Sequence, residues 1–215
     1  MGASQQMANV QFYAKAFVTL LVLVNPLEGI AIFLSATEDS APALRAAIAR
    51  RASIAVTLIL LLSLFLGNAL LRVFDISIGA FQVGGGALLL LIAFRMTLGD
   101  GGASLGRSPG KTIDLAFSVV PLAIPLLAGP GAISGAILYG TRTHSPVELG
   151  LLGGVAIAVG IATYASFLAA EPMVRFLKQS GISIATRVMG LIIAAIAVEM
   201  MAHGVASLFG LKLLA

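Results

Sequence analysis

The sequence predicts an all-α integral membrane protein of six transmembrane helices, arranged as two inverted three-helix repeats with helices 1 and 4 interrupted at mid-membrane. Three observations predict this fold. The 215 residues are 59% hydrophobic and 10% charged, with a mean hydropathy of +1.06. Apolar stretches of spanning length recur along the chain, and two of them carry proline and glycine at corresponding positions. A water-soluble domain of this length would need more polar surface to cover its core.

The apolar stretches are each long enough to cross a bilayer, which takes about 20 residues as a helix. They run approximately over residues 15–36, 46–72, 77–98, 113–140, 147–171 and 184–212. Charged or turn-rich segments separate them at residues 38–42, 74–75, 99–111, 141–148 and 172–181. We therefore expect one transmembrane domain over residues 1–215, with repeat 1 at about 14–98, a linker at about 99–112 and repeat 2 at about 113–213.

Lysine and arginine are unevenly shared between the two sets of connections. Alternate connections hold nine of the 13 basic residues: Arg45, Arg50, Arg51, Arg95, Arg107, Lys111, Arg175, Lys178 and Arg187. The opposite side holds Lys15, Arg72, Arg142 and Lys212. Cytoplasmic loops of multi-pass proteins are the ones enriched in Lys and Arg. The asymmetry predicts that both termini are extracytoplasmic.

The first apolar stretch is interrupted near its middle by the run Asn25-Pro26-Leu27-Glu28-Gly29. Proline lacks an N–H and clashes with the preceding turn, and the freed backbone groups cannot face lipid. The N-terminus of a half-helix suits a carboxylate, and the carbonyl end of the preceding half suits an ammonium, so the break predicts a site for an amino acid zwitterion. We expect Asn25 to cap the second half and Pro26, Glu28 and Gly29 to line the site.

The fourth stretch carries a matching interruption. Pro121 and Pro125 precede the run Ala128-Gly129-Pro130-Gly131, and Ser134 follows one turn later. The small residues Gly129, Gly131, Ala132 and Gly135 leave room for a small solute only. We expect the binding site to be completed by Gly129, Pro130, Gly131 and Ser134. Simple kinking by proline is the alternative for each break. The glycine run at residues 84–86 in the third stretch favours close helix packing over binding.

An internal repeat relates the two interruptions. Asn25-Pro26 corresponds to Gly129-Pro130, and Ile76-Ser77-Ile78 corresponds to Ile182-Ser183-Ile184, at an offset of about 105 residues. A unit of three helices crosses the membrane an odd number of times, so its second copy must insert upside down. Many secondary transporters are built in this way, with the solute near the midplane between the repeats. A duplicated fold without a transport role is the alternative.

Three ionisable residues lie in or beside the predicted spans: Glu28, Glu199 and His203. Such groups are costly in lipid and are candidates for function. Glu199 and His203 are four residues apart on one helix face, as a proton-accepting pair or as partners in a packing hydrogen bond. Coupling of transport to H⁺ or Na⁺ through these three residues is left open. Two His residues and no Cys cannot form a four-ligand zinc site, and no cofactor is expected.

Several runs of this sequence resemble those of the MarC family of membrane proteins. They are Asn25-Pro26-Leu27, Ile32-Phe33-Leu34, Ile76-Ser77, Ala80-Phe81, Gly85-Gly86, residues 120–134 and residues 187–192. The resemblance covers nearly the whole chain and implies a six-helix protein of the cytoplasmic (inner) membrane. Some family members, of the SnatA type, are associated with transport of glycine, alanine and similar amino acids. The chain departs from the family pattern at Gln82, where many relatives have Arg, and at Glu28, where the residue is usually small or polar and uncharged.

The sequence thus predicts a secondary transporter of small neutral amino acids rather than an enzyme. A small amino acid and membrane lipid are the expected partners, nucleic acid is not, and a homo-oligomer is left open. The alternatives are a passive channel, an exporter of other small solutes and, last, an intramembrane hydrolase. Ser134 and His203 are the only conceivable hydrolytic pair, and the run Ala132-Ile133-Ser134-Gly135 lacks the G-x-S-G arrangement that exposes a serine nucleophile.

Overall fold

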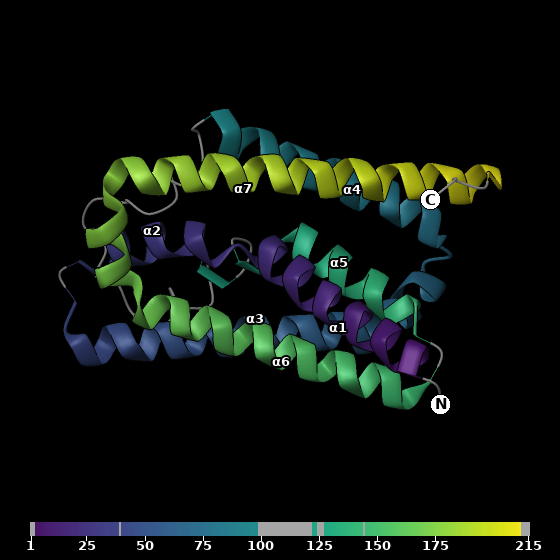
Figure 1. Cartoon of the computed structure of the whole chain (residues 1–215), viewed down its shortest axis with the longest axis horizontal. Helices are drawn as coiled ribbons and strands as arrows, with labels where there is room; N and C mark the ends of the chain where they lie inside the picture. Colours follow the sequence, from purple (N-terminus) through teal and green to yellow (C-terminus); the bar gives the residue numbers. More distant parts are fainter. Residues whose placement is uncertain (1–2, 39, 99–121, 124–126, 144, 212–215) are drawn as a thin grey trace.

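The computed structural model describes residues 3–38, 40–98, 122–123, 127–143 and 145–211, and Figure 1 shows their arrangement. Regular structure in these ranges is helical. The helices are α1 (Ala3–Val24), α2 (Pro26–Thr37), α3 (Pro42–Val73), α4 (Ile78–Leu98), α5 (Pro130–Thr141), α6 (Pro146–Leu168) and α7 (Ala170–Phe209). The all-α prediction is confirmed for this part of the chain. The expected linker at 99–112, and residues 113–121 and 124–126 of the expected fourth span, lie outside the described residues.

Five stretches of the described residues are long and apolar enough to cross a membrane. They are Val10–Leu34, Pro42–Val73, Ile78–Leu98, Pro146–Leu168 and Gly181–Phe209. The first of them includes most of α1 and of α2, and the last is the greater part of α7. These stretches match the expected spans one, two, three, five and six.

Proline marks the start of four of these helices. α2, α3, α5 and α6 begin at Pro26, Pro42, Pro130 and Pro146. The first helical position suits proline because its N–H would be unpaired there and its fixed φ is already helical. Before α6, Ser145 adds a cap, since its side chain accepts a hydrogen bond of 3.2 Å from the backbone N–H of Glu148. The proline positions therefore predict these helix starts.

The connection expected between residues 172 and 181 is wrong, because α7 runs through it. Pro172 is the third residue of α7, where the missing N–H costs no intrahelical hydrogen bond, and Gly181 is tolerated inside the helix. The first turns of α7 still run across the direction of the remainder in Figure 1. By contrast, the expected turn at residues 74–75 is present, with Asp75 at a φ of 53°.

α4 and α7 lie side by side and antiparallel (Figure 1). A Cβ added to Gly79 of α4 would lie 2.9 Å from the carbonyl oxygen of Gly204 in α7. A Cβ added to Gly86 would lie 2.8 Å from the carbonyl oxygen of Ala197. Residue numbers therefore rise along α4 as they fall along α7. The small residues let the two backbones approach closely, as they do between membrane helices.

The packing role expected for residues 84–86 is confirmed for two of the three glycines. Gly86 faces the α7 backbone, and a Cβ on Gly85 would lie 2.6 Å from Cε of Met200. A Cβ on Gly84 would meet nothing within 4 Å. Gly84 is thus exposed on the outer side of the α4–α7 pair.

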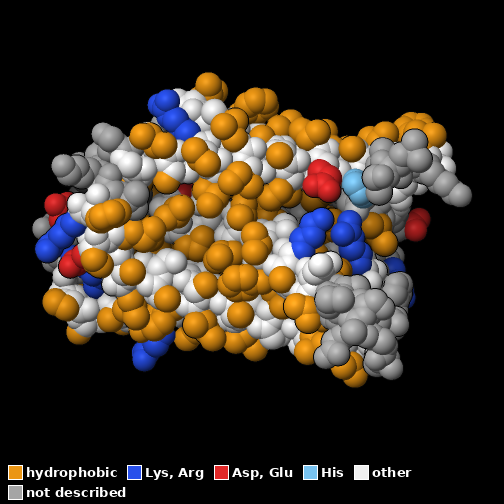
Figure 2. All heavy atoms as spheres, in the orientation of Figure 1, with side chains coloured by type: hydrophobic (Ala, Val, Ile, Leu, Met, Phe, Trp, Pro, Cys, Tyr) orange, Lys and Arg blue, Asp and Glu red, His pale blue; other side chains and the backbone are white. Residues whose placement is uncertain are grey.

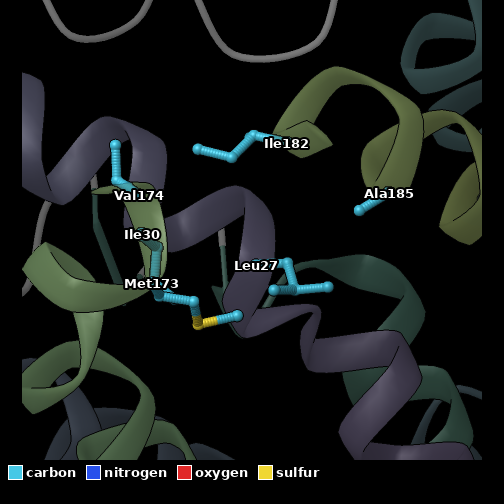
Figure 3. Close-up of a pocket in the computed structure, with 6 residues that line it drawn as sticks. All are labelled: Leu27, Ile30, Met173, Val174, Ile182 and Ala185. Atoms are coloured by element: carbon cyan, nitrogen blue, oxygen red, sulfur yellow. The ribbon is translucent and has the colours of Figure 1, made fainter. Parts of the chain in front are cut away.

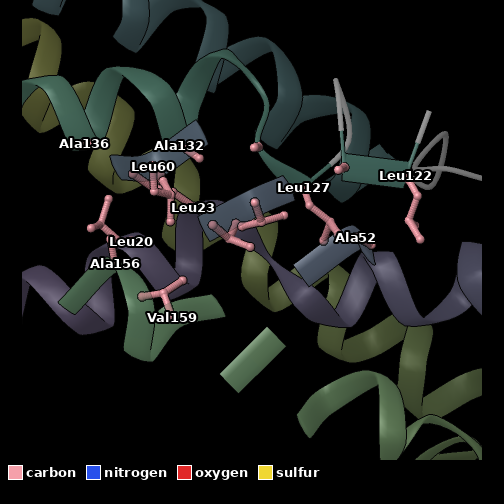
Figure 4. Close-up of a cluster of buried hydrophobic side chains, with 14 of the residues drawn as sticks. Leu20, Leu23, Ala52, Leu60, Leu122, Leu127, Ala132, Ala136, Ala156 and Val159 are labelled. Carbon is pink, nitrogen blue, oxygen red and sulfur yellow. The ribbon is translucent and has the colours of Figure 1, made fainter. Parts of the chain in front are cut away.

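The centre of the molecule is an apolar cluster to which all seven of the described helices contribute, and Figure 4 shows part of it. α1 and α3 each contact both α5 and α6, while α2 contacts α6 and α7 and α5 also contacts α4. The buried members include Leu20 and Leu23 of α1, Ala52 and Leu60 of α3, Ala132 and Ala136 of α5, and Ala156 and Val159 of α6. Small residues at this crossing bring α1 and α5 close together.

The outside of the molecule is also apolar. Leu91 of α4, Ile161 of α6 and Leu191 of α7 are 59%, 64% and 62% exposed. Figure 2 shows a broad apolar band across the middle of the visible face, with charged side chains on both sides of it along the long axis. Water would not stabilise such a surface, whereas the hydrocarbon core of a bilayer would cover it.

Candidate functional site

The first interruption is a single residue between two helices. α1 ends at Val24, Asn25 adopts a left-handed conformation with φ 48° and ψ 65°, and α2 begins at Pro26. Asparagine is among the few non-glycine residues that enter this region readily. In an unbroken helix the Val22 carbonyl would accept a hydrogen bond from residue 26, but proline has no N–H to donate. The carbonyl end of α1 and the N–H end of α2 therefore meet at Asn25.

The side chain of Asn25 does not form the expected cap, because an N-cap acts from extended backbone whereas Asn25 is left-handed. Its Nδ2 instead donates to Glu28 Oε2 at 3.1 Å and to Met96 Sδ of α4 at 3.7 Å. Its Oδ1 is buried and has no hydrogen-bond partner among the described residues. The residue as a whole is only 6% exposed. The first N–H groups of α2 consequently have no side-chain cap.

The second interruption lies immediately before α5. The N–H of Ala128 donates to the Ala123 carbonyl at 2.8 Å, a bond to the fifth preceding residue that marks a π-type turn. Gly129 then adopts extended backbone, with φ −75° and ψ 179°, and α5 begins at Pro130. No side chain caps this helix either. Pro121 and Pro125, predicted to bend the first half of this span, lie outside the described residues.

The remaining predicted residues of the second interruption are distributed between surface and interior. Pro130 is exposed, whereas Gly129 and Gly131 are buried and Ser134 is 4% exposed. A Cβ on Gly131 would overlap the side chain of Leu89 in α4. A Cβ on Gly85 would lie 2.6 Å from Ser134 Oγ. α4 therefore packs directly on the first turns of α5.

The structure brings the two interruptions together. Gly29 and Pro26 are buried, and a Cβ added to Gly29 would lie 2.7 Å from Cδ2 of Leu127, two residues before Gly129. On the other side of the crossing, a Cβ added to Gly135 of α5 would lie 2.5 Å from Cδ1 of Leu23 in α1. The sequence predicted both breaks, but their contact is a property of the tertiary fold.

A hydrogen bond ties the same two helices further from the breaks. The Tyr139 hydroxyl of α5 donates to Thr19 Oγ1 of α1 at 3.1 Å. Tyr139 is 7% exposed, so this bond lies inside the molecule, about two helical turns from Asn25. It fixes the register of α1 against α5 and was not predicted, because neither residue stands out in the sequence.

A pocket lies beside the first interruption, between α2 and the first part of α7 (Figure 3). It holds roughly 260 Å³ of empty space, including the opening at its mouth, and its lining residues are Leu27, Ile30, Met173, Val174, Ile182 and Ala185. The lining offers no charged or polar side chain to a zwitterion. At the crossing itself, Gly29 and Leu127 lie too close together to admit even an added methyl group, so binding between them requires these elements to separate.

Two opposite charges lie near the first break. Glu28 is the third residue of α2 and is partly buried, and its carboxylate accepts the Asn25 hydrogen bond. Arg95, in the last turn of α4, is exposed and acts electrostatically on Glu28. A negative charge at the first turn of a helix is favourable because the helix dipole is positive there.

Glu199 and His203 lie together on an exposed face of α7. Nδ1 of His203 lies 3.0 Å from the backbone carbonyl oxygen of Glu199, so the ring bonds the helix backbone and not the Glu199 carboxylate. This bond lies within one helix on an exposed face, so it decides neither of the two sequence interpretations. A coupling role for either residue stays a prediction. The described residues contain no group of three or more potential metal ligands among His, Cys, Asp and Glu.

Arg45, one of the basic residues that predict the orientation, also has a structural role. From the start of α3 it donates to the backbone carbonyl oxygens of Thr37 at 2.9 Å and Glu38 at 3.2 Å, and it forms an ion pair with Glu171 at the start of α7. It thereby joins the ends of three helices. The sequence pattern that indicates this role is a basic residue that follows a helix after a short connection, because cations favour helix C-termini.

Comparison with known proteins places the whole membrane domain in one family. Residues 10–209 match the model of the MarC family integral membrane protein. The chain is 38% identical over 203 residues to the UPF0056 membrane protein YhcE of Escherichia coli strain K12, covering 92% of this chain and 93% of the relative. It is 37% identical over 206 residues to a UPF0056 membrane protein of Buchnera aphidicola subsp. Schizaphis graminum, covering 94% of this chain and 96% of that protein.

An archaeal relative shows the same full-length match. A UPF0056 membrane protein of Archaeoglobus fulgidus is 32% identical over 200 residues, covering 92% of this chain and 93% of the relative. No solved structure matches the chain. The apolar helices, the broken segments and these matches lead to one conclusion: the chain belongs to the MarC family of integral membrane proteins.

Proposed function

We propose that this protein is a secondary transporter of small neutral amino acids, such as glycine and alanine, across the cytoplasmic membrane. The observation that carries the proposal is the contact between two interrupted segments, one at Asn25 and one at Gly129, in a molecule of otherwise long apolar helices. Irregular backbone is tolerated in a membrane only where protein or a watery cavity satisfies it. Paired interruptions of this kind are the binding sites of many secondary transporters.

The chemistry of the two breaks fits a zwitterion. α2 and α5 both present uncapped N–H groups at their first turns, which suit a carboxylate. The carbonyl end of α1 suits an ammonium group. Apart from Asn25 and Glu28, the surrounding residues are small or apolar, and Ser134 offers a buried hydroxyl. A solute with a bulky side chain would collide with Leu89 or Leu127, which already lie against the glycines of the breaks.

The helix contacts support the inverted repeat that this mechanism needs. In an inverted repeat, α2, α3 and α4 correspond to α5, α6 and α7. The α2–α6 and α2–α7 contacts then correspond to the α5–α3 and α5–α4 contacts, and all four are present. The antiparallel α4–α7 pair maps onto itself under the same correspondence. In the proposal, α5 belongs to the expected fourth span, and both termini are extracytoplasmic because most basic residues of α3 and α7 lie nearer the starts of these helices than their ends.

Transport then follows from separation of the two halves. The contact of Gly29 with Leu127 and that of Gly135 with Leu23 lie on successive parts of the same crossing. Opening one contact while the other stays closed would expose the site to one side of the membrane at a time, as alternating access requires. Because each contact is between glycine and a leucine side chain, small displacements suffice to admit a small solute.

The proposal is tested with the purified protein in lipid nanodiscs and in proteoliposomes. A ligand that favours the folded state raises the melting temperature. Glycine, alanine and serine should each raise it, and leucine, glutamate and lysine should not. Proteoliposomes should accumulate labelled glycine or alanine with saturable kinetics. Flux equal to that of empty liposomes across all the amino acids would overturn the proposal, and non-saturable flux would favour the passive channel instead.

A further inference from the structure

The two interruptions differ in charge although they occupy equivalent places in the repeat. Asn25 and Glu28 of the first correspond to Gly129 and Ala132 of the second, by the same alignment that pairs Pro26 with Pro130. The first break therefore carries an amide and a carboxylate, while the second carries neither. An arrangement that bound only a zwitterion would need no net charge at either break. The asymmetry calls for a separate explanation.

The oxygen atoms of the first break point to a positively charged ligand. Asn25 is 94% buried, being 6% exposed, and its Oδ1 has no partner among the described residues. The amide is oriented by its Nδ2, which donates to Glu28 Oε2 at 3.1 Å, so Oδ1 of the same amide lies near that carboxylate. A buried amide oxygen without a partner is costly, by about 1–3 kcal/mol. A cation would satisfy it without needing a proton from the protein.

Further oxygens lie at the end of α1. The Leu21 carbonyl accepts a hydrogen bond from the Asn25 N–H at 3.0 Å, but Pro26 has no N–H to donate to the Val22 carbonyl. They carry the negative end of the α1 dipole toward Asn25. Hard cations prefer carbonyl and carboxylate oxygens. The first break thus contains an amide oxygen, a carboxylate and main-chain carbonyls within residues 22–28.

The number of charges favours a monovalent ion. Glu28 is the only acidic residue of the first break, and a divalent cation would normally be held by several carboxylates. Arg95 acts on Glu28 from the exposed end of α4, but it forms no ion pair with Glu28 within the described residues. Unpaired charge is expensive at this depth, so Glu28 gains from a bound counter-ion.

We infer that the first interruption binds one desolvated Na⁺ ion, held by Asn25 Oδ1, the Glu28 carboxylate and the Val22 carbonyl oxygen, while the second interruption takes the carboxylate of the amino acid. The inference rests on the proposed function in assigning the ion to coupling, but the binding of Na⁺ itself does not depend on transport. The ion and the first N–H groups of α2 would then flank the solute.

The experiment measures Na⁺ binding without any amino acid. The protein in nanodiscs is melted in NaCl, KCl and choline chloride at equal ionic strength and fixed pH. Since the chain has no Trp and no Cys, unfolding is followed by circular dichroism. Direct binding of ²²Na⁺ is measured in parallel by a scintillation proximity assay. The melting temperature should rise with NaCl in a saturable way, and KCl and choline chloride should have little effect.

Two variants and one matched control locate the ion. Glu28→Gln keeps the shape and removes the charge, and Asn25→Gly removes Oδ1 while accommodating the left-handed backbone. Each should weaken ²²Na⁺ binding at least tenfold and abolish the Na⁺-dependent rise. Glu38→Gln, an exposed acidic residue at the other end of α2, should behave as the wild type. The ²²Na⁺ assay on whichever variant folds is sufficient to decide.

Identical melting curves in NaCl and choline chloride, with no saturable ²²Na⁺ binding, would overturn the inference. A stabilisation that follows pH at constant Na⁺ and disappears in Glu28→Gln would also overturn it, in favour of a proton shared by Glu28 and Asn25. Equal uptake of labelled alanine in both salts would support the proposed function and exclude Na⁺ as its coupling ion. Na⁺ binding without amino acid binding would support the ion site and contradict the proposed function.

Discussion

Replacing Gly29 with alanine should damage the contact on which the proposed site depends. The added Cβ would lie 2.7 Å from Cδ2 of Leu127 and 3.4 Å from Cε1 and Cζ of Phe167. Leu127 is 1% exposed, and Phe167 is 3% exposed with its ring packed 4.8 Å from that of Phe33. Neither side chain can withdraw freely, so the first interruption must move away from the second by a few tenths of an ångström.

The magnitude follows from two opposing effects. Overpacking in a well-packed interior costs about 1–3 kcal/mol. Alanine in place of glycine within a helix returns about 0.5–1 kcal/mol. The net destabilisation of Gly29→Ala should be about 1–2 kcal/mol. The matched control is Gly154→Ala in α6, where a Cβ would meet nothing within 4 Å and only the favourable propensity effect remains.

The assay compares both variants with the wild type by thermal circular dichroism in nanodiscs and by alanine uptake in proteoliposomes. Gly29→Ala should melt below the wild type and transport more slowly by about tenfold, because a small displacement of binding groups has a large effect on rate. Gly154→Ala should melt at or above the wild type and transport normally. Equal stability and equal uptake for the two variants would refute the reasoning.

The remaining predictions concern three other parts of the molecule. Gly86→Ala should lower the melting temperature clearly, since the Cβ would meet a backbone carbonyl that cannot move aside, whereas Gly84→Ala should not. Arg45→Ala should destabilise the protein by about 1–2 kcal/mol by unpairing two carbonyls at the end of α2, while Glu171→Gln, in a half-exposed ion pair, should cost about 0–1 kcal/mol. Denaturant or thermal unfolding measures the stability of each of these variants. Asn25→Asp should bind ²²Na⁺ more tightly than the wild type, and weaker binding would contradict the ion site.

The sequence predicted those features that local chemistry determines. The breaks at Asn25 and Gly129 follow from the prolines at positions 26 and 130, because proline at a first helical position ends the hydrogen bonding of the preceding segment. The same rule explains the start of α3 at Pro42. It also explains the error at residues 172–181, since Pro172 lies within the first turn of α7 and interrupts nothing.

The features that were missed depend on tertiary contact or on backbone conformation. No sequence pattern shows that Leu127 packs on Gly29, because those residues are far apart along the chain. The capping role of Asn25 was predicted from residue type, and the left-handed backbone replaced it with the bond to Glu28. Periodicity placed Glu199 and His203 on one face, but the ring bonds a backbone carbonyl instead of the carboxylate.

Counterflow of labelled alanine is the measurement that tests the central claim most directly. Proteoliposomes loaded with unlabelled alanine and diluted into a trace of labelled alanine should accumulate the label transiently above its outside concentration, because one site faces each side in turn. Gly29→Ala should reduce this accumulation, and Gly154→Ala should preserve it. Absence of counterflow from folded wild-type protein, with any small neutral amino acid as the internal load, would contradict the account.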